Sequence, residues 1–309
     1  MFGGKIPRPG RHIFTSFRSC QAAVGTCLLS LALTAGGITQ QARMPRDSVR
    51  HQRIMESEVP GRRTELKTLK GARLFVGEDF ERGSRVPLIV HFHGAPWLVE
   101  KHIAGSLPRA TLITVQLGAG SSAYGRPFVD ADLFSKLIDE ARNAIGLKGD
   151  WSSITLIGFS AGYGAIRAIL RQEKYYRRVD AVILLDGVHA SYSPEGKPTA
   201  DGGIVNAADL DSFRKLARDA AAGNKSFLIT HSEIFPGTYA STTECADYLL
   251  SSLAVKRTAG EKPGPMGMLQ RSKAARGRFT VIGYSGKTAA DHIDHLHAMP
   301  AWFKYIRIK

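Results

Sequence analysis

The stretch from residue 153 to residue 170 constrains the fold of this chain more than any other. It starts with a β-branched, apolar run, passes through Gly158, Ser160 and Gly162 in the spacing G-x-S-x-G, and continues into a helix-forming run. Such a strand-to-helix turn is so tight that the serine takes a strained backbone conformation and its neighbours need very small side chains. The turn therefore predicts that the Ser160 hydroxyl is exposed at the carboxyl edge of a sheet, where it can act as a nucleophile.

Short apolar segments alternate with longer amphipathic ones from about residue 62 onward. This rhythm predicts βαβ units, and hence a three-layer α/β fold with a mostly parallel sheet covered by helices on both faces. The strands we expect lie at residues 66–76 (a hairpin region), 87–92, 111–117, 154–158, 181–185, 226–230 and 278–284. Helices are expected at 96–103, 130–145, 164–172, 207–222 and 242–253. Residues 191–203 and 256–277 are rich in Gly, Pro and charge, which predicts surface loops, the second of them a small cap near the site.

The segment at residues 87–92 is apolar and is followed by His93 and Gly94. A strand that ends in His-Gly, two strands before a serine turn of this kind, resembles the α/β-hydrolase superfamily of serine esterases and lipases. The resemblance covers nearly everything from about residue 62 to residue 309. It implies an oxyanion hole with one backbone amide from Ala161, the residue after the nucleophile. The second amide is expected from Gly94 or Ala95, because Pro96 has no N–H.

Two carboxylates compete for the role of the acid in a catalytic triad, for which the resemblance implies the order Ser, Asp or Glu, then His. Asp186 directly follows the apolar run at 181–185 and precedes Gly187, whereas Glu233 follows the next strand, at 226–230. Members of the superfamily with the acid after either strand are known. We favour Asp186, because Glu233 lies in a turn before Pro236, and keep Glu233 as the alternative.

Three histidines follow the last predicted strand, where the superfamily has its catalytic base. We rank them in the order His292, His295, His297, and expect one of them to meet Ser160. Asp291 and Asp294 lie among them and make metal binding an alternative, but no H-E-x-x-H motif is present. We therefore expect neither a metal nor another cofactor.

The net charge of +15 is concentrated near the N-terminus. Residues 1–73 contain 13 basic and 4 acidic side chains, and the remaining 236 residues contain 29 and 23. The chain has no basic stripe with interleaved aromatic residues of the kind that binds nucleic acid. We therefore expect no nucleic-acid partner.

The N-terminal part of the chain has the layout of a secretory signal peptide. Four basic residues precede an uncharged, largely apolar stretch at 22–38, and the first acidic residue is Asp47. We expect a leader at residues 1–42, a linker at 43–61 and one hydrolase domain at 62–309. Export to the periplasm or the extracellular space follows from this interpretation, without stable membrane insertion once the leader is removed. A membrane anchor and an organelle transit peptide are the alternatives.

Together these patterns predict a serine hydrolase that cleaves carboxylic esters of small molecules through an acyl-enzyme intermediate. The alternatives are a binding protein that keeps the fold without the activity, and a metal-dependent hydrolase. Six aromatic residues in predicted loops or turns are candidates for the lining of a substrate pocket: Tyr124, Phe128, Phe159, Tyr163, Tyr192 and Tyr239.

Overall fold

The structure is a computed structural model that describes residues 54–80 and 85–308. The predicted leader and most of the predicted linker lie outside the described residues. Within the part of the chain that is described, no helix is both long enough and apolar enough to cross a membrane.

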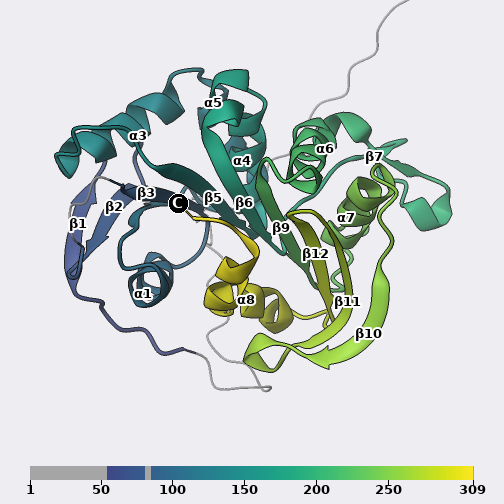
Figure 1. The fold of residues 1–309 in the computed structure, drawn as a ribbon. Helices are drawn as coiled ribbons and strands as arrows, with labels where there is room; N and C mark the ends of the chain where they lie inside the picture. The colour runs from purple at the N-terminus through teal and green to yellow at the C-terminus, as the bar shows by residue number, and fades with distance from the viewer. Residues whose placement is uncertain (1–53, 81–84, 309) are drawn as a thin grey trace, which may run out of the picture. The chain divides into compact units, whose positions relative to one another are not determined.

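A 10-stranded sheet forms the centre of the described domain, in the order β1-β2-β4-β3-β5-β6-β9-β12-β11-β10 (Figure 1). Its six middle strands are parallel: β4 (Thr111–Val115), β3 (Pro87–Phe92), β5 (Ser153–Phe159), β6 (Val179–Leu185), β9 (Ser226–His231) and β12 (Phe279–Tyr284). An antiparallel hairpin, β1 (Gly61–Glu65) and β2 (Ala72–Gly77), extends one edge.

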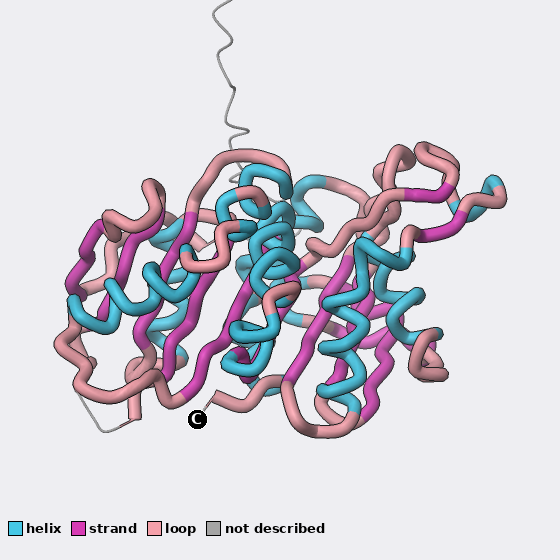
Figure 2. Tube along the Cα trace, turned by 90° about the horizontal axis from the view of Figure 1, so that it is seen from above, coloured by secondary structure: helices cyan, strands magenta, loops and turns pink. Residues whose placement is uncertain are grey.

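Helices cover both faces of this sheet (Figure 1; Figure 2). One face packs against α3 (Leu133–Ala144), α4 (Tyr163–Leu170), α6 (Ala207–Ala221) and α7 (Thr242–Ser251), with the short α5 (Glu173–Arg178) at the end of α4. The other packs against α1 (Pro96–Ser106), α8 (Ala289–His297) and the 3₁₀ segment η5 (Met299–Tyr305). The predicted three-layer α/β fold with a mostly parallel sheet is confirmed.

The middle strands are apolar on both faces because both faces are buried. Leu156 of β5 belongs to the core under α4, whereas its neighbour Ile157 belongs to the core under α8. Val90 and Ile89 of β3 divide between the two cores in the same way. Successive side chains of a strand point to opposite faces, so an unbroken apolar run is the expected pattern here.

Side-chain caps fix where several helices begin. The side chain of Asn206, the predicted N-cap of α6, accepts a hydrogen bond from the backbone amide of Ala208. A capping box between Ser241 and Glu244 starts α7. A second capping box, between Thr288 and Asp291, starts α8. The last of these caps orients the helix that contains all three candidate histidines.

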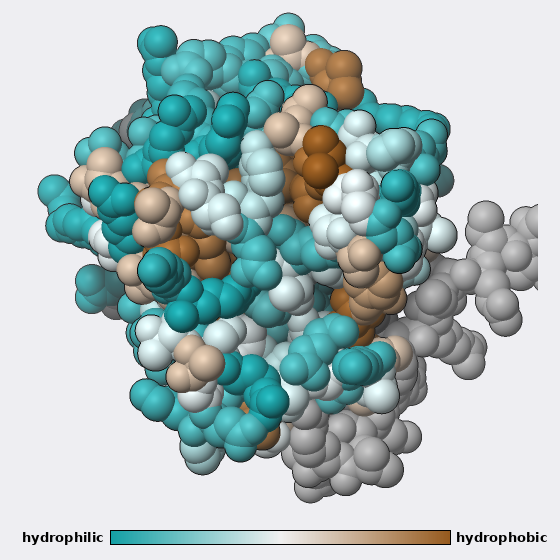
Figure 3. All heavy atoms as spheres, turned by 90° about the vertical axis from the view of Figure 1, so that its right-hand side faces the viewer, coloured by the Kyte–Doolittle hydropathy of each residue, from teal (hydrophilic) through white to brown (hydrophobic). Residues whose placement is uncertain are grey.

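The prediction of a loop and cap at residues 256–277 is wrong. This segment forms two further antiparallel strands of the sheet, β10 (Thr258–Pro263) and β11 (Leu269–Arg276), joined by the 3₁₀ turn η4 (Pro265–Gly267). All six residues of β10 are exposed at the sheet edge, so the strand needs no apolar face. Charged residues are typical of such an edge because they oppose pairing with other chains. The side of the domain that faces the viewer in Figure 3 is mainly hydrophilic.

The other predicted loop, residues 191–203, is mostly irregular but contains short regular pieces. Its strand β7 (Tyr192–Ser193) pairs with β8 (Ile204–Val205), just beyond the predicted range, and the 3₁₀ turn η3 (Thr199–Asp201) lies between them. This segment leads from the end of β6 to α6, and its first residues reach the site described next.

Candidate active site

Ser160 lies in the sharp turn between β5 and α4. Its φ is +47°, in the left-handed region that a residue other than glycine adopts only at a cost of about 1–3 kcal/mol. The short 3₁₀ segment η2 (Ser160–Gly162) leads directly into α4. A side chain at Gly162 would collide with the backbone carbonyl of Phe92 at the end of β3. The tight turn predicted from the G-x-S-x-G spacing is therefore present, for the steric reason expected.

The end of β6 lies directly against this turn. A side chain at Gly187 would collide with the backbone of Ser160, so only glycine fits between the two strand ends. The residue before it, Asp186, also has a positive φ, of +43°. The ends of β5 and β6 thus place a strained serine and a strained aspartate next to each other.

The carboxylate of Asp186 is buried and fully engaged. Its Oδ2 accepts hydrogen bonds from His292 Nδ1 at 2.8 Å and from the Ser232 hydroxyl at 2.7 Å. Its Oδ1 accepts one from the Ser232 backbone amide at 2.9 Å. Burial alone would raise the pKa of Asp186, but the adjacent His295, His292 and Ser232 outweigh it and hold the pKa well below its usual value. Asp186 is therefore a carboxylate at neutral pH.

His292 is the histidine that the fold brings to this carboxylate. Its ring lies 4.6 Å, centroid to centroid, from the ring of Phe159, the residue that precedes Ser160. Its side chain is 23% exposed, so the ring is open to solvent on one side. In the neutral ring, with the Nδ1 proton directed at Asp186, the other ring nitrogen, Nε2, has a lone pair that can accept a proton.

His295 and His297 have other environments. His295 is fully buried, its Nδ1 is 2.8 Å from the Thr230 hydroxyl, and its carbonyl accepts a hydrogen bond from the indole of Trp302 at 2.9 Å. His297 is buried at the end of α8, close to His102 of α1; burial, and secondarily His297, lowers the pKa of His102 to about 4. These two side chains pack α8 against the sheet and against α1.

Glu233, the alternative acid, is exposed and makes its contacts elsewhere. Its carboxylate accepts a hydrogen bond from the backbone amide of Gly286 at 3.3 Å, and its own amide donates to the Gly286 carbonyl at 2.9 Å. Glu233 thus joins the loop after β9 to the loop after β12. The structure brings Asp186 to His292 and places Glu233 in this loop contact.

The loop expected to provide part of an oxyanion hole follows β3 and is held from several sides. The side-chain amide of Gln116 donates a hydrogen bond to the Gly94 carbonyl. His93 stacks on Phe159 with 5.9 Å between ring centroids, and its Nδ1 is 2.9 Å from the Tyr124 hydroxyl. Ala95 directly precedes α1 as its N-cap.

Ala161 lies in the first turn of the helical segment after Ser160. Backbone amides in a first turn have no acceptor within their own helix. The positive end of the helix dipole adds to their attraction for negative charge. An oxyanion formed at Ser160 would meet this favourable potential.

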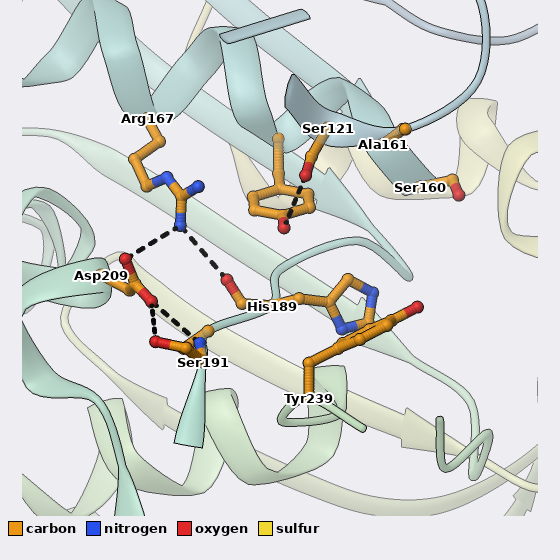
Figure 4. Close-up of a pocket in the computed structure, with 11 residues that line it drawn as sticks. Ser121, Ser160, Ala161, Arg167, His189, Ser191, Asp209 and Tyr239 are labelled. Carbon is orange, nitrogen blue, oxygen red and sulfur yellow. Dashed lines mark hydrogen bonds and ion pairs between the residues drawn. The ribbon is translucent and has the colours of Figure 1, made fainter. Parts of the chain in front are cut away.

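A cavity of about 500 Å³ opens beside Ser160 (Figure 4). It is lined by Ser160 and Ala161, by Tyr163 and Arg167 of α4, and by residues from the loops after β6 and β9, His189 and Tyr239 among them. Of the six aromatic candidates, Tyr163 and Tyr239 line this cavity. The other four are buried in the core: Tyr124, Phe128, Phe159 and Tyr192.

Several residues of this region were not predicted from the sequence. Ser232 follows β9 directly and binds Asp186 twice, yet a serine after a strand gives no distinct signal. Arg167 lies one helical turn after Tyr163, so the helical spacing of four could have placed it on the same face. Asp209, in the first turn of α6, was indistinguishable from an ordinary helix-start acid.

Within the described residues, no group of three or more His, Cys, Asp or Glu side chains is arranged to hold a metal ion. The serine turn and the chain order of Ser160, Asp186 and His292 are those of the α/β-hydrolase type of fold. The fold type predicted from the sequence is therefore confirmed.

Comparisons with known proteins find similarity at low identity, and only to solved structures. No family model and no curated protein matches the sequence. Among solved structures, the feruloyl esterase module of Clostridium thermocellum is similar at 10% identity and a TM-score of 0.46, over 84% of this chain and 94% of that chain. Carboxyl esterase 2 of Tuber melanosporum is similar at 16% identity and a TM-score of 0.45, over 82% and 86%. An acylaminoacyl peptidase of Pyrococcus horikoshii is similar at 14% identity and a TM-score of 0.43, over 80% of this chain. The chain spans only 42% of the length of that peptidase.

Proposed function

We propose that this protein is a serine hydrolase that cleaves carboxylic esters. The observation that supports this most is the 2.8 Å contact between Asp186 and His292, placed beside a serine in a strained turn. A nucleophile, a base and a carboxylate that orients the base form the arrangement required for nucleophilic acyl transfer.

In the proposed mechanism, His292 Nε2 accepts the hydroxyl proton of Ser160 as the oxygen attacks the ester carbonyl. Asp186 holds the ring in the required tautomer and stabilises the imidazolium that forms. The backbone amides of Ala161 and of Gly94 or Ala95 stabilise the oxyanion. The protonated His292 then gives its proton to the leaving alcohol.

Water completes the reaction on the acyl-enzyme. His292 accepts a proton from the water as it attacks the ester carbonyl carbon, and the bond between the acyl carbon and the Ser160 oxygen breaks. The proton returns to Ser160, and the free acid leaves. The net reaction consumes one ester and one water and yields one acid and one alcohol.

A panel of p-nitrophenyl esters of graded chain length, with a fluorophosphonate probe, tests this proposal. We expect hydrolysis and probe labelling by the wild type, and a loss of about 10³-fold or more in kcat for Ser160→Ala and for His292→Ala. Glu233→Gln serves as the control, because its carboxylate contacts the Gly286 amide and neither Asp186 nor His292. Undiminished ester hydrolysis by Ser160→Ala would overturn the proposal.

We further propose that residues 1–42 direct export of the chain, as their layout predicts. Expression of the full chain in a bacterial host and N-terminal sequencing of the product test this. A mature N-terminus near residue 43 in the periplasmic fraction is expected, and an intact N-terminus in the cytoplasm would contradict export.

A further inference from the structure

The cavity beside Ser160 contains one pair of opposite charges (Figure 4). Arg167 comes from α4, and Asp209 comes from the first turn of α6. No other Lys, Arg, Asp or Glu is among the described residues that line this cavity. The ionic character of the cavity therefore depends on how these two side chains are engaged.

Arg167 is held loosely. Its Nη1 lies 3.7 Å from an oxygen of Asp209 and 3.4 Å from the backbone carbonyl of His189. Both distances exceed the 2.7–2.9 Å typical of charge-assisted hydrogen bonds. The guanidinium also lies over the ring of Tyr163, 5.3 Å from its centroid. A guanidinium has five N–H donors, so most of its capacity is left for a ligand.

Asp209 is engaged much more firmly. Its Oδ2 accepts hydrogen bonds from the Ser191 amide at 2.8 Å and from the Ser191 hydroxyl at 2.7 Å. Burial alone would raise the pKa of Asp209, but Ser191 and the charges of Arg167 and Arg171 hold the pKa below its usual value. Because Asp209 is bound to Ser191 and close to a second cation, it does not fully neutralise Arg167.

The position of Arg167 relative to Ser160 sets the size of ligand that can reach both. The two residues are seven positions apart on one continuous helical segment, an axial separation of about 10 Å. Helical side chains lean toward the N-terminus of their helix, so Arg167 leans back toward Ser160. Burial lowers the pKa of the intervening His189, which is therefore neutral at pH 7 and adds no competing charge.

We infer that the cavity binds a carboxylate of the substrate, so that the preferred esters have a carboxylate a few bonds away from the ester carbonyl. This inference rests on the proposed function for the role of Ser160. Arg167 takes the carboxylate in a paired, fork-like geometry while the ester carbonyl lies at Ser160. Arg167 takes no part in bond changes and acts as a specificity residue.

Matched esters with and without a terminal carboxylate test the inference. One arm compares the p-nitrophenyl monoesters of succinate, glutarate and adipate with neutral p-nitrophenyl esters of equal chain length. The other compares acetyl esters of hydroxycarboxylic acids with acetyl esters of neutral alcohols. The arm that shows the preference tells whether the carboxylate belongs to the acyl or the alcohol part.

We expect wild type to prefer the carboxylate esters in one arm, and Arg167→Met to lower kcat/KM for them about 10- to 100-fold, mainly through KM. Hydrolysis of the neutral esters should change little. Arg177→Met is the control, since Arg177 of α5 is an exposed cation that pairs with Glu173 and does not line the cavity. It should leave the preference within about twofold, as expected for an exposed charge.

Two kinetic results would overturn the inference while the proposed function stands: no preference for carboxylate esters in a wild type whose activity requires Ser160, or an undiminished preference in Arg167→Met. Full activity of Ser160→Ala would instead overturn the proposed function. Binding of glutarate monoamide to Ser160→Ala, measured by calorimetry, separates recognition from catalysis. We expect weaker binding once Arg167→Met is added to Ser160→Ala, and equal binding by the single and the double variant would also overturn the inference.

Discussion

The ends of two neighbouring strands, β6 and β9, each have an acid near the carboxyl edge of the sheet. The two acids differ in burial and in hydrogen bonding. Asp186, after β6, is 4% exposed, has a positive φ and accepts three hydrogen bonds. Glu233, after β9, is exposed and accepts a single long hydrogen bond from a backbone amide. The residue that separates the two roles is Ser232, which follows β9 and donates from both its amide and its hydroxyl to the acid of β6.

This difference shows that the position of an acid depends less on its own strand than on the hydrogen-bond donors at the end of the neighbouring strand. A buried carboxylate is costly unless each of its oxygens is hydrogen-bonded. Ser232 satisfies both oxygens of Asp186 and leaves Oδ2 shared with His292. Glu233, one residue further along the chain, has already turned toward the loop after β12.

Neutralising each acid in turn should separate the roles of Asp186 and Glu233 with the largest effect. Asp186→Asn keeps the size of the side chain but can present an amide N–H to His292, which favours the wrong tautomer. We expect kcat/KM for esters to fall about 10³- to 10⁴-fold. Glu233→Gln keeps the loop contact with Gly286 and should stay within about threefold of wild type, as is typical of an exposed polar contact.

The measurement is steady-state hydrolysis of one p-nitrophenyl ester by both variants, with thermal unfolding to confirm that they fold. The reverse pattern, with Glu233→Gln inactive and Asp186→Asn active, would show that the contact with His292 is not the catalytic one.

Replacement of Ser232 tests whether it positions Asp186, and should have a smaller effect on activity. Ser232→Ala removes the 2.7 Å hydrogen bond to Oδ2 of Asp186 but keeps the one from the backbone amide to Oδ1. Loss of one hydrogen bond to a buried charge is worth about 1.5–3 kcal/mol, so we expect a fall in kcat of about 10-fold or somewhat more, with KM little changed. Ser232→Thr keeps the hydroxyl and should restore most of the activity. If alanine and threonine at this position behave alike, Ser232 does not position the acid.

Much of this site could be predicted from the sequence, because the positions of its residues depend on local steric rules. The turn at Ser160 requires Gly162, and the contact between strand ends requires Gly187, so both glycines are visible in the sequence. Asp186 could be ranked above Glu233 because it ends an apolar run and precedes a glycine. His292 could be ranked first because it follows the last strand by a short loop.

The remaining features depend on contacts between distant segments and have no local signature. Ser232 and Asp186 are 46 residues apart, and only the pairing of β6 with β9 brings them together. The pair of Arg167 and Asp209 joins α4 to α6 across the cavity. The strands β10 and β11 were missed for a different reason: all but one of their residues are exposed or half-buried, so they lack the apolar alternation by which strands are recognised.

Acid-dependent unfolding gives the last and smallest test, at His231, which precedes Ser232 at the end of β9. Burial, and secondarily the charge of Arg257, lowers the pKa of His231 to about 4. In the unfolded chain this histidine has its ordinary pKa of about 6.5, so between about pH 6.5 and pH 4 it binds a proton more readily than in the folded state. The stabilisation from a neutral His231 is therefore complete above about pH 6.5 and is lost as the pH falls toward about 4.

In His231→Gln, an amide that never charges replaces the ring and can still bond Thr243 and the Ser232 carbonyl, the two partners of His231 Nδ1. We expect urea unfolding between about pH 7.5 and pH 5 to show a shallower loss of unfolding free energy in this variant than in wild type. Glu233→Gln is the control, because it changes an exposed side chain two residues further along and leaves His231 in place. An identical pH slope in His231→Gln and wild type would mean that the end of β9 opens to water before the rest of the domain unfolds. The exposed part of the chain after β9 would then start before Glu233, whereas the end of β6 stays buried.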